Sequence, residues 1–440
     1  MRQTTRSLLL LLALTAVALT AGHYLKASCS DVPWDGSQFT TYCYSDIIAL
    51  YHTRGLDESV PYLPDQGPSD VPADERAGFL EYPVLTGLLV GVAGKLTASG
   101  LFGWSASGLT FLRWNSLLLA PFALGTTYLL VRLVGPRRAA LFAIAPPIVL
   151  YSSYNWDILA VFFLVLGIER LERGLPLQSG LAIGLGGAAK LFPLVAAPFL
   201  FLLLVRRTHL LDGAPRAAEG LWRSLLSAGP AWRFALGGVA AIIGVHIPLV
   251  LAGGGPLYLE MLRFHSGRVP NTESLWTALS FLLGRIGTPV PAESLALASL
   301  PALALGSLGL ATWIWRRTPS VAAVAYAPLL LLLVTTVFFS LQYVLWVLPL
   351  FALVTLPTGH YTAFLVGDLA VLGTLFPLFA NDNPAAWEAT FLIVSVAVLV
   401  RATVFLVVLG WLVRRSGGVS AVPHDLAAPR QSVTRAARQA

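Results

Sequence analysis

One carboxylate stands in a setting that suits acid–base chemistry. Asp46 lies within the stretch from Tyr42 to Leu56, between aromatic and aliphatic residues, in the first polar loop after an N-terminal apolar segment. Such neighbours would hold the side chain against a membrane surface, where a carboxylate can accept a proton from a hydroxyl group. The alternative is structural, because Asp is a favoured N-cap and Asp46 could cap a helix after Ser45. We predict that Asp46 is a catalytic base.

The composition indicates that lipid is part of the solvent of this chain. Hydrophobic residues make up 56% of it and charged residues 12%, whereas a soluble globular protein has about 25% charged residues. The mean hydropathy is +0.73. This is more apolar surface than a soluble fold can bury. The sequence therefore predicts an all-α, polytopic transmembrane helical bundle.

The distribution of charge predicts how the bundle is oriented. The net charge is +7, but the arginines cluster at segment ends, as expected of cytoplasmic loops and not of a nucleic-acid surface. The stretch from Lys26 to Glu81 carries ten Asp or Glu residues against three basic ones, so we expect it outside the cytoplasm. The arginine pairs are Arg137-Arg138, Arg206-Arg207, Arg316-Arg317 and Arg414-Arg415. No nucleic-acid partner is expected.

Both cysteines, Cys29 and Cys43, fall in the acidic loop. An oxidising compartment would allow them to form a disulfide, with two free thiols as the alternative. No spacing of Cys, His, Asp or Glu indicates a metal site, so no cofactor is required, and a divalent metal is possible without being indicated.

The apolar segments divide the chain into six regions. The first segment has the alternative of a cleaved signal peptide, but its cleavage pattern is poor and we expect it to be retained. Both termini are then cytoplasmic. The regions are a first transmembrane helix (1–25), an acidic extracytoplasmic loop (26–80), a helical membrane module (81–251) with a cytoplasmic loop (206–232), a second extracytoplasmic loop (252–294), C-terminal transmembrane helices (295–413) and a disordered cytoplasmic tail (414–440).

Two topologies with about twelve spans fit the middle of the chain. If the segment from Tyr82 to Ala98 is re-entrant, the arginine-rich ends stay inside and Asn155 and Lys190 reach the outer face. If it spans the membrane, the runs around Lys190 merge into one long kinked helix. The charge bias favours the first topology.

Five stretches, in this order, resemble the GT-C glycosyltransferases, and specifically family GT87, an integral membrane family that uses polyprenyl-phosphate sugars. Two positions depart from the family pattern, because Val84 and Leu341 stand where proline is frequent. The stretches are Tyr44–Tyr51; Glu81-Tyr82-Pro83; Asn155-Trp156-Asp157 with the glycine-rich run into Lys190–Pro193; Phe264-His265 to Glu273-Ser274-Leu275; and Phe339–Trp346.

The resemblance implies a glycosyltransferase that moves a sugar, mannose or arabinofuranose, from a polyprenyl-phosphate donor to a cell-envelope glycan, glycolipid or glycoprotein. Such a transfer needs a base for the acceptor hydroxyl, support for the departing phosphate, and a groove for the lipid tail. Asp46 supplies the base. A single base without a partner carboxylate suggests inversion at the sugar carbon. The site would lie on the extracytoplasmic face of the cytoplasmic membrane.

The same resemblance and the tolerance of the membrane for few polar groups nominate the substrate-binding residues. His265, with Arg263 or Arg268 and with Lys190, could bind the phosphate. Structural alternatives are an interfacial carboxylate for Glu81, helix caps for Asn155 and Asp157, and backbone contacts for Gln342 and Tyr343. The remaining candidates are Tyr82 and Glu273.

Two other functions remain open. A transporter or flippase of a lipid-linked saccharide would also need polar residues within the membrane and a lateral opening. It would not need an outer-face carboxylate beside a histidine and arginines, and the chain lacks the repeat symmetry typical of many transporters. The third possibility is an inactive subunit that keeps the fold without the chemistry.

Overall fold

The computed structural model describes residues 2–30, 35–56, 59–63, 77–211, 228–381 and 383–415. Over these residues the protein consists of helices joined by turns, with no strand. The predicted all-α class is confirmed. The last 25 residues of the predicted tail and most of the predicted cytoplasmic loop, residues 212–227, lie outside the described part.

Seven helical segments of the described chain are long and apolar enough to cross a membrane. They establish a multi-pass membrane protein, because each offers close to the 20 apolar residues that a span requires. The segments are α1 (Arg2–Ala27), α5 (Gly108–Val134), α10 (Phe192–Leu211), α12 (Gly229–Leu251), α15 (Ala292–Ala296) continued by α16 (Ser299–Arg317), α19 (Thr358–Phe379) and α20 (Pro384–Arg415).

Shorter helices fill the space between these segments. Several begin at or just after prolines, which fit the first helical turn but interrupt a helix that is already running. Their short length is tolerated because they pack against protein on most sides, and α17 and α18 are almost completely buried. They are α6 (Pro136–Ala143), α7 (Pro146–Tyr151), α8 (Asp157–Glu172), α9 (Pro176–Ala189), α17 (Val321–Thr335) and α18 (Val344–Leu353).

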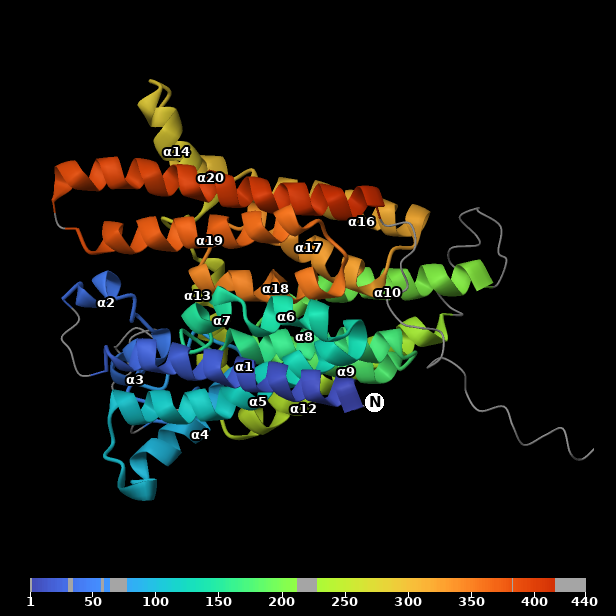
Figure 1. Cartoon of the computed structure of the whole chain (residues 1–440), viewed down its shortest axis with the longest axis horizontal. Coiled ribbons are helices and arrows are strands. Elements are labelled where there is room, and N and C mark those ends of the chain that lie inside the picture. Colours follow the sequence, from blue (N-terminus) through green and yellow to red (C-terminus); the bar gives the residue numbers. More distant parts are fainter. Residues whose placement is uncertain are drawn as a thin grey trace, which may run out of the picture.

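The described chain reverses direction at each connection between these helices. With α6 and α7 counted as one return, it passes along the bundle twelve times, through α1, α5, α6–α7, α8, α9, α10, α12, α16, α17, α18, α19 and α20. Figure 1 shows the two resulting ends, with the N-terminus at one and the small helices α2 (Ser37–Thr40) and α3 (Asp46–Thr53) at the other. The number of passes agrees with the predicted spans.

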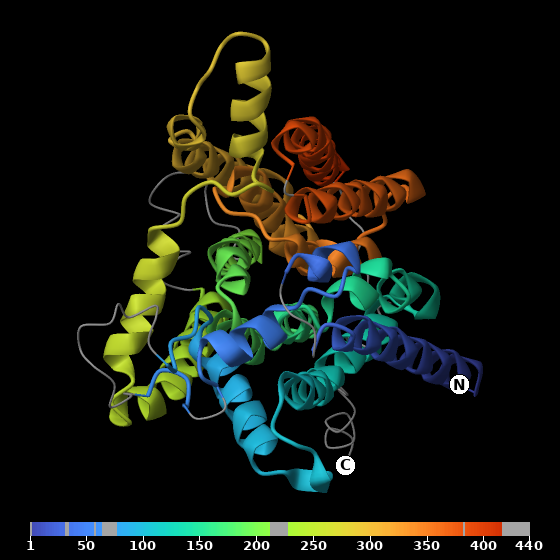
Figure 2. The same ribbon diagram turned by 90° about the vertical axis from the view of Figure 1, so that its left-hand side faces the viewer.

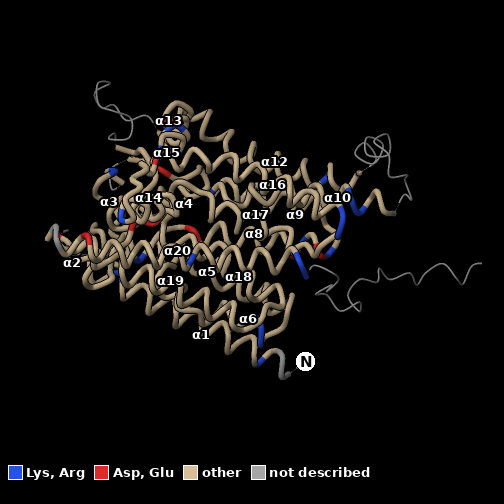
Figure 3. Tube along the Cα trace, turned by 90° about the horizontal axis from the view of Figure 1, so that it is seen from above, with Lys and Arg blue, Asp and Glu red and all other residues tan. Residues whose placement is uncertain are grey.

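The two ends differ in charge. The arginine pairs fall on the connections near the N-terminus, at what we call the arginine end, and Figure 3 shows Lys and Arg concentrated where α10 finishes there. The opposite end, here called the α2–α4 end, holds the first connection together with α4 (Val84–Ala98) and a 3₁₀ turn (Leu101–Gly103). The second predicted loop also lies at this end and is largely helical, with α13 (Gly255–Ser266), α14 (Leu275–Arg285) and α15.

Helix α4 does not run through the bundle. Along its length it meets residues of the α2–α4 end, with Gly87 against the Tyr62 ring and Gly94 against the Leu56 carbonyl. The Thr86 hydroxyl donates to the Ala189 carbonyl at 2.7 Å, where α9 ends. Figure 2, which faces this end, shows α4 lying across it. Helix α4 therefore lies at one end of the bundle (Figure 2), and the re-entrant topology stays a prediction.

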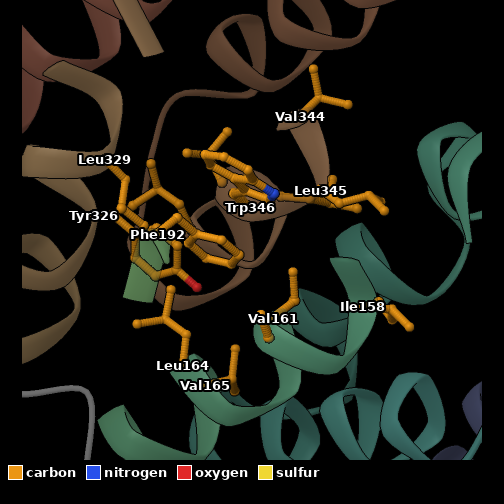
Figure 4. Close-up of a cluster of buried hydrophobic side chains, with 14 of the residues drawn as sticks. Ile158, Val161, Leu164, Val165, Phe192, Tyr326, Leu329, Val344, Leu345 and Trp346 are labelled. Atoms are coloured by element: carbon orange, nitrogen blue, oxygen red, sulfur yellow. The ribbon is translucent and has the colours of Figure 1, made fainter. Parts of the chain in front are cut away.

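The core beneath the α2–α4 end is packed by aromatic and branched side chains (Figure 4). The Phe192 ring of α10 stacks on the Trp346 ring of α18 with centroids 4.4 Å apart. Helices within lipid associate through close packing, because the lipid tails are as apolar as the side chains. Glycines serve the same purpose between α9 and α12, where a Cβ at Gly180 would collide with the Phe234 carbonyl.

Candidate functional site

A cavity of about 340 Å³ lies at the α2–α4 end, where six connections of the chain meet. Nine of the residues predicted from the sequence line it: Asp46, Glu81, Tyr82, Lys190, His265, Arg268, Glu273, Gln342 and Tyr343. The other lining residues are Phe39, Tyr44, Leu50, Tyr154, Phe338, Ser340 and Phe379. The structure therefore brings Asp46 and His265 into one space, although 219 positions separate them (265 − 46).

The backbone around Asp46 is held by the connection between α7 and α8. The Asp46 amide donates to the Tyr154 carbonyl at 2.9 Å, and the Ser45 hydroxyl donates to the Ser153 carbonyl at 2.7 Å. Ser45 occupies the N-cap position of α3, and Asp46 is the first helical residue. The capping alternative for Asp46 is therefore wrong, since its carboxylate is turned to other partners.

Those partners are two tyrosine hydroxyls. The Tyr82 hydroxyl donates to Asp46 Oδ2 at 3.0 Å, and the Tyr44 hydroxyl is a second hydrogen-bond partner. Burial raises the pKa of Asp46 to about 6, although both hydrogen bonds favour the ionised form. Burial and the Asp46 charge hold the pKa of Tyr82 well above its usual value, so the phenol keeps the proton that it donates. Asp46 is thus an acceptor at neutral pH.

The disulfide between Cys29 and Cys43 links the residues that follow α1 to the segment just before Asp46. Its two Cα atoms lie 5.6 Å apart, within the usual range for a disulfide. Lys26, in the last turn of α1, donates to the Tyr42 carbonyl at 2.8 Å in the same region. The disulfide and this hydrogen bond restrict the position of the segment that leads to Asp46.

Lys190 lies at the break between α9 and α10 and is held on several sides. Its ammonium group pairs with Asp157 and lies 4.7 Å from the centroid of the Tyr82 ring. The rings of Tyr343 and Trp346 lie 5.3 Å and 5.9 Å from the same nitrogen. Aromatic faces attract a cation, which lowers the cost of burying this charge.

Asn155 and Asp157 lie directly behind the cavity wall and do not line it. The Asn155 side-chain oxygen accepts from the Asp157 amide at 3.0 Å. Trp156 occupies the N-cap position of α8 and, in the described structure, no side chain caps that helix, so the capping alternative is wrong for Asn155 and for Asp157. The Asn155 amide nitrogen also donates to the Tyr82 hydroxyl at 3.5 Å. Asp157 accepts from the Trp346 indole at 2.7 Å in addition to pairing with Lys190. Asn155 therefore contacts Tyr82 and Asp157 contacts Lys190, and each helps to position a side chain that lines the cavity.

His265 reaches the cavity from the last turn of α13. Its Nε2 lies 2.6 Å from the Glu81 carbonyl, and because a carbonyl only accepts, Nε2 carries the proton. Burial, Arg268 and Lys190 lower its pKa, so the ring is neutral at neutral pH and is a hydrogen-bonding group there. The Glu81 carboxylate pairs with Arg54 through Oε1, and its Oε2 is buried without a hydrogen-bond partner among the described residues.

The two arginines near His265 are placed differently. Arg268 lines the cavity with its guanidinium 3.9 Å from the Phe338 ring and 4.9 Å from the Phe264 ring. Among the described residues it forms no ion pair. Arg263 is not in the cavity; its side chain is 73% exposed and pairs with Glu260. The prediction for Arg263 is wrong because two steps of about 100° place it opposite His265 on α13.

Glu273 is the third carboxylate of the cavity. Its side chain accepts from the Asn271 amide, and burial raises its pKa to about 7. In the part of the chain that the structure describes, no three His, Cys, Asp or Glu side chains come together as candidate metal ligands.

An aromatic cluster that was not predicted from the sequence lies on one side of the cavity. The Phe39 ring stacks on the Tyr44 ring at 5.5 Å and meets the Phe379 ring at 5.2 Å, while Tyr44 lies 5.3 Å from Tyr154. Tyr44 also bonds to Asp46, and Asp46 bonds to Tyr82, which faces Lys190. Asp46 therefore lies between an aromatic side and a cationic side. Only Tyr44, inside the stretch that carries Asp46, offered a sequence signal.

The chain was compared with known proteins. No family model matches it, and no curated protein matches it. Two solved structures are similar over 91% of the chain: ArnT from Cupriavidus metallidurans in the apo state, and ArnT from the same organism bound to undecaprenyl phosphate. Each has 15% identity and a TM-score of 0.39, and 76% and 77% of the respective ArnT chain is covered. At these values no family is established, and the resemblance to GT87 stays a prediction.

The buried pair of Lys190 and Asp157 predicts a difference in stability. Replacing Lys190 by Met leaves a fully buried carboxylate without its cation, and we expect a loss of about 3–5 kcal/mol in the free energy of unfolding. Arg285→Gln is the matched control, because Arg285 pairs with Glu388 at the surface, where a pair is worth about 0–1 kcal/mol. Thermal unfolding in detergent measures both; equal melting temperatures for the two variants would contradict the buried pairing.

Proposed function

We propose that this protein is a membrane glycosyltransferase of the GT-C type that transfers a sugar from a polyprenyl-phosphate donor. The observation that carries the proposal is the position of Asp46, an ionisable carboxylate that faces a cavity between aromatic rings and cationic groups. A base must lie where acceptor and donor meet, and this is such a place.

The proposed reaction uses Asp46 as the base. The acceptor hydroxyl attacks the anomeric carbon of the donor sugar, and its proton passes to the ionised Asp46 carboxylate. The bond between that carbon and the phosphate oxygen breaks, and the oxygen leaves with the electron pair as polyprenyl phosphate. Attack from the face opposite the phosphate inverts the anomeric carbon. Above a pH of about 6 Asp46 is ionised and able to act.

Of the cationic groups, Arg268 is the best suited to the phosphate. Lys190 already pairs with Asp157, whereas Arg268 has no carboxylate partner among the residues described. Two phenylalanine rings hold its guanidinium plane, whose parallel N–H groups match phosphate oxygens. His265 lines the same cavity, with its Nε2–H donated to the Glu81 carbonyl. Lys190 lines the cavity and adds the electrostatic attraction of its positive charge.

The aromatic side suits the acceptor. Rings such as Phe39, Tyr44 and Phe379 offer flat apolar faces to the C–H groups of a sugar. We take the acceptor to be a cell-envelope glycan, glycolipid or glycoprotein and the transferred sugar to be mannose or arabinofuranose, as the sequence resemblance implies. Divalent metal remains optional in this scheme.

The orientation in the cytoplasmic membrane follows from charge. Arginine-rich connections stay in the cytoplasm, which places the arginine end and both termini inside and the cavity outside. The disulfide between Cys29 and Cys43 lies at the cavity end, in agreement with an oxidising compartment.

Asp46→Asn tests the base directly. With radiolabelled polyprenyl-phosphate sugars, we expect the variant to transfer about 10²–10⁴ times more slowly than the wild type, because the amide cannot accept the proton. Glu169→Gln is the control, since it removes a buried carboxylate of α8 that pairs with Arg173 at the arginine end. Equal rates for Asp46→Asn and wild type would remove Asp46 from the chemistry. Wild type that transfers nothing but moves lipid across vesicles would favour a flippase.

Arg268→Gln tests the phosphate position. Loss of a charge-assisted bond worth about 1.5–3 kcal/mol should weaken the binding of undecaprenyl phosphate in detergent by about 10- to 100-fold. Arg263→Gln is the matched control, five positions away, exposed and paired with Glu260. The assignment of the phosphate to Arg268 is wrong if both variants bind the lipid as tightly as wild type.

A further inference from the structure

Arg401 is a charged residue inside a membrane-spanning helix, and it is not among the residues that line the cavity. It lies in α20, eighteen positions from the start of the helix at Pro384 (counted inclusively), and only 3% of it is exposed. A charge at such a place is costly and is retained where it has a specific partner or task.

The contacts of Arg401 join two segments that are far apart in the sequence. Its Nη2 donates to the Glu273 carbonyl at 2.7 Å. Its guanidinium lies 3.7 Å from the centroid of the Phe339 ring. One side chain therefore holds the connection before α14 and the connection between α17 and α18.

These two segments also contact each other directly. The Asn271 amide nitrogen donates to the Phe339 carbonyl at 2.6 Å, and the Phe339 amide donates back to the Asn271 side-chain oxygen at 3.0 Å. The Trp276 indole donates to the Thr335 carbonyl at 3.0 Å close by. Asn271 thus makes the paired contacts that a neighbouring strand would make.

The joined segments form one wall of the cavity. Six lining residues belong to them: Arg268, Glu273, Phe338, Ser340, Gln342 and Tyr343. The wall includes Arg268, which is proposed to bind the phosphate, and the carboxylate of Glu273. Arg401 itself is not among the lining residues, so any effect that it has on a ligand passes through this wall.

Helix α19 brings an acidic residue close to Arg401. Asp368 is fully buried there and accepts from the Tyr151 hydroxyl at 3.1 Å. A Cβ added at Gly367 would lie 3.5 Å from the Arg401 Cα, which shows how closely α19 approaches α20 at this level. Asp368 Oδ2 and Arg401 Nη1 have no hydrogen-bond partner among the described residues. Arg401 is therefore oriented by its contacts to the wall and not by a direct ion pair.

We infer that Arg401 is a positioning residue: through the Glu273 carbonyl and the Phe339 ring it fixes the wall that carries Arg268. The effect on the binding of a lipid phosphate rests on the proposed function. The restraint that Arg401 places on the wall does not depend on that function. The inference makes the geometry of the site depend on α20, the last helix described.

Labelling of Ser340→Cys tests the wall without any substrate. The introduced thiol is the only free one, because the chain has two cysteines and they form a disulfide. When Arg401→Gln is added, we expect the maleimide labelling rate of Cys-substituted Ser340 to rise about tenfold, which corresponds to about 1.4 kcal/mol of lost restraint. Glu169→Gln, which alters a buried charge at the arginine end, should leave the rate unchanged. Equal rates in both backgrounds would overturn the inference.

A second measurement separates positioning from a loss of stability and from the proposed function. Folded Arg401→Gln should bind undecaprenyl phosphate about tenfold more weakly than wild type, whereas Glu169→Gln should bind normally even if its melting temperature falls. Unchanged affinity in Arg401→Gln would contradict positioning. If wild type does not bind this lipid, the proposed function fails and the labelling rates still decide the role of Arg401.

If Arg401→Gln does not accumulate, Arg401→Lys takes its place in both measurements. Lysine keeps the positive charge, but its ammonium group lacks the planar guanidinium that can stack on the Phe339 ring and donate to the Glu273 carbonyl at the same time. We expect faster labelling and weaker lipid binding, as for Arg401→Gln. Wild-type values for this variant would overturn the inference.

Discussion

The hydrogen bond from the Tyr82 hydroxyl to Asp46 is the contact on which the site depends. Asp46 comes from α3, Tyr82 from the approach to α4, and the Tyr82 ring faces Lys190 at the break between α9 and α10. One phenol therefore positions the carboxylate and at the same time offers its ring to a buried cation. Because α4 begins directly after it and lies across the same end (Figure 2), Tyr82 stays at the end of the bundle where the other connections meet.

The cost of burying charge explains which groups remain available for a ligand. Lys190 is paired with Asp157 and Glu81 with Arg54, and such buried pairs need their partners. Arg268 is held by two aromatic rings instead, and Asp46 is held by neutral phenols. These two groups can meet a phosphate and a hydroxyl without first breaking an ion pair.

The sequence was sufficient for the helices and for the residues at their outer ends. Long apolar runs and arginine pairs predict the bundle and its two ends, and the same reasoning brought Asp46, Lys190 and His265 to one end. Prediction from the sequence failed where the direction of a side chain depends on its position around a helix. Arg263 and Arg268 are equivalent candidates in the sequence, but on α13 the Arg263 side chain points away from the cavity. The role of Arg401 was not predicted, because it lies in a strongly apolar segment and tertiary packing alone brings it to Glu273 and Phe339.

The pH dependence of sugar transfer tests most directly whether Asp46 is the base. In the wild type the rate should rise with pH through about 6, where Asp46 loses its proton. Tyr82→Phe removes a bond that favours the ionised form, so the rise should move upward by about one pH unit. Tyr154→Phe is the control, because its hydroxyl lies in the same cavity and, within the described structure, forms no hydrogen bond to the Asp46 carboxylate; it should not move the rise. A rate independent of pH between about 5 and 8, or an identical profile in Tyr82→Phe, would contradict the account.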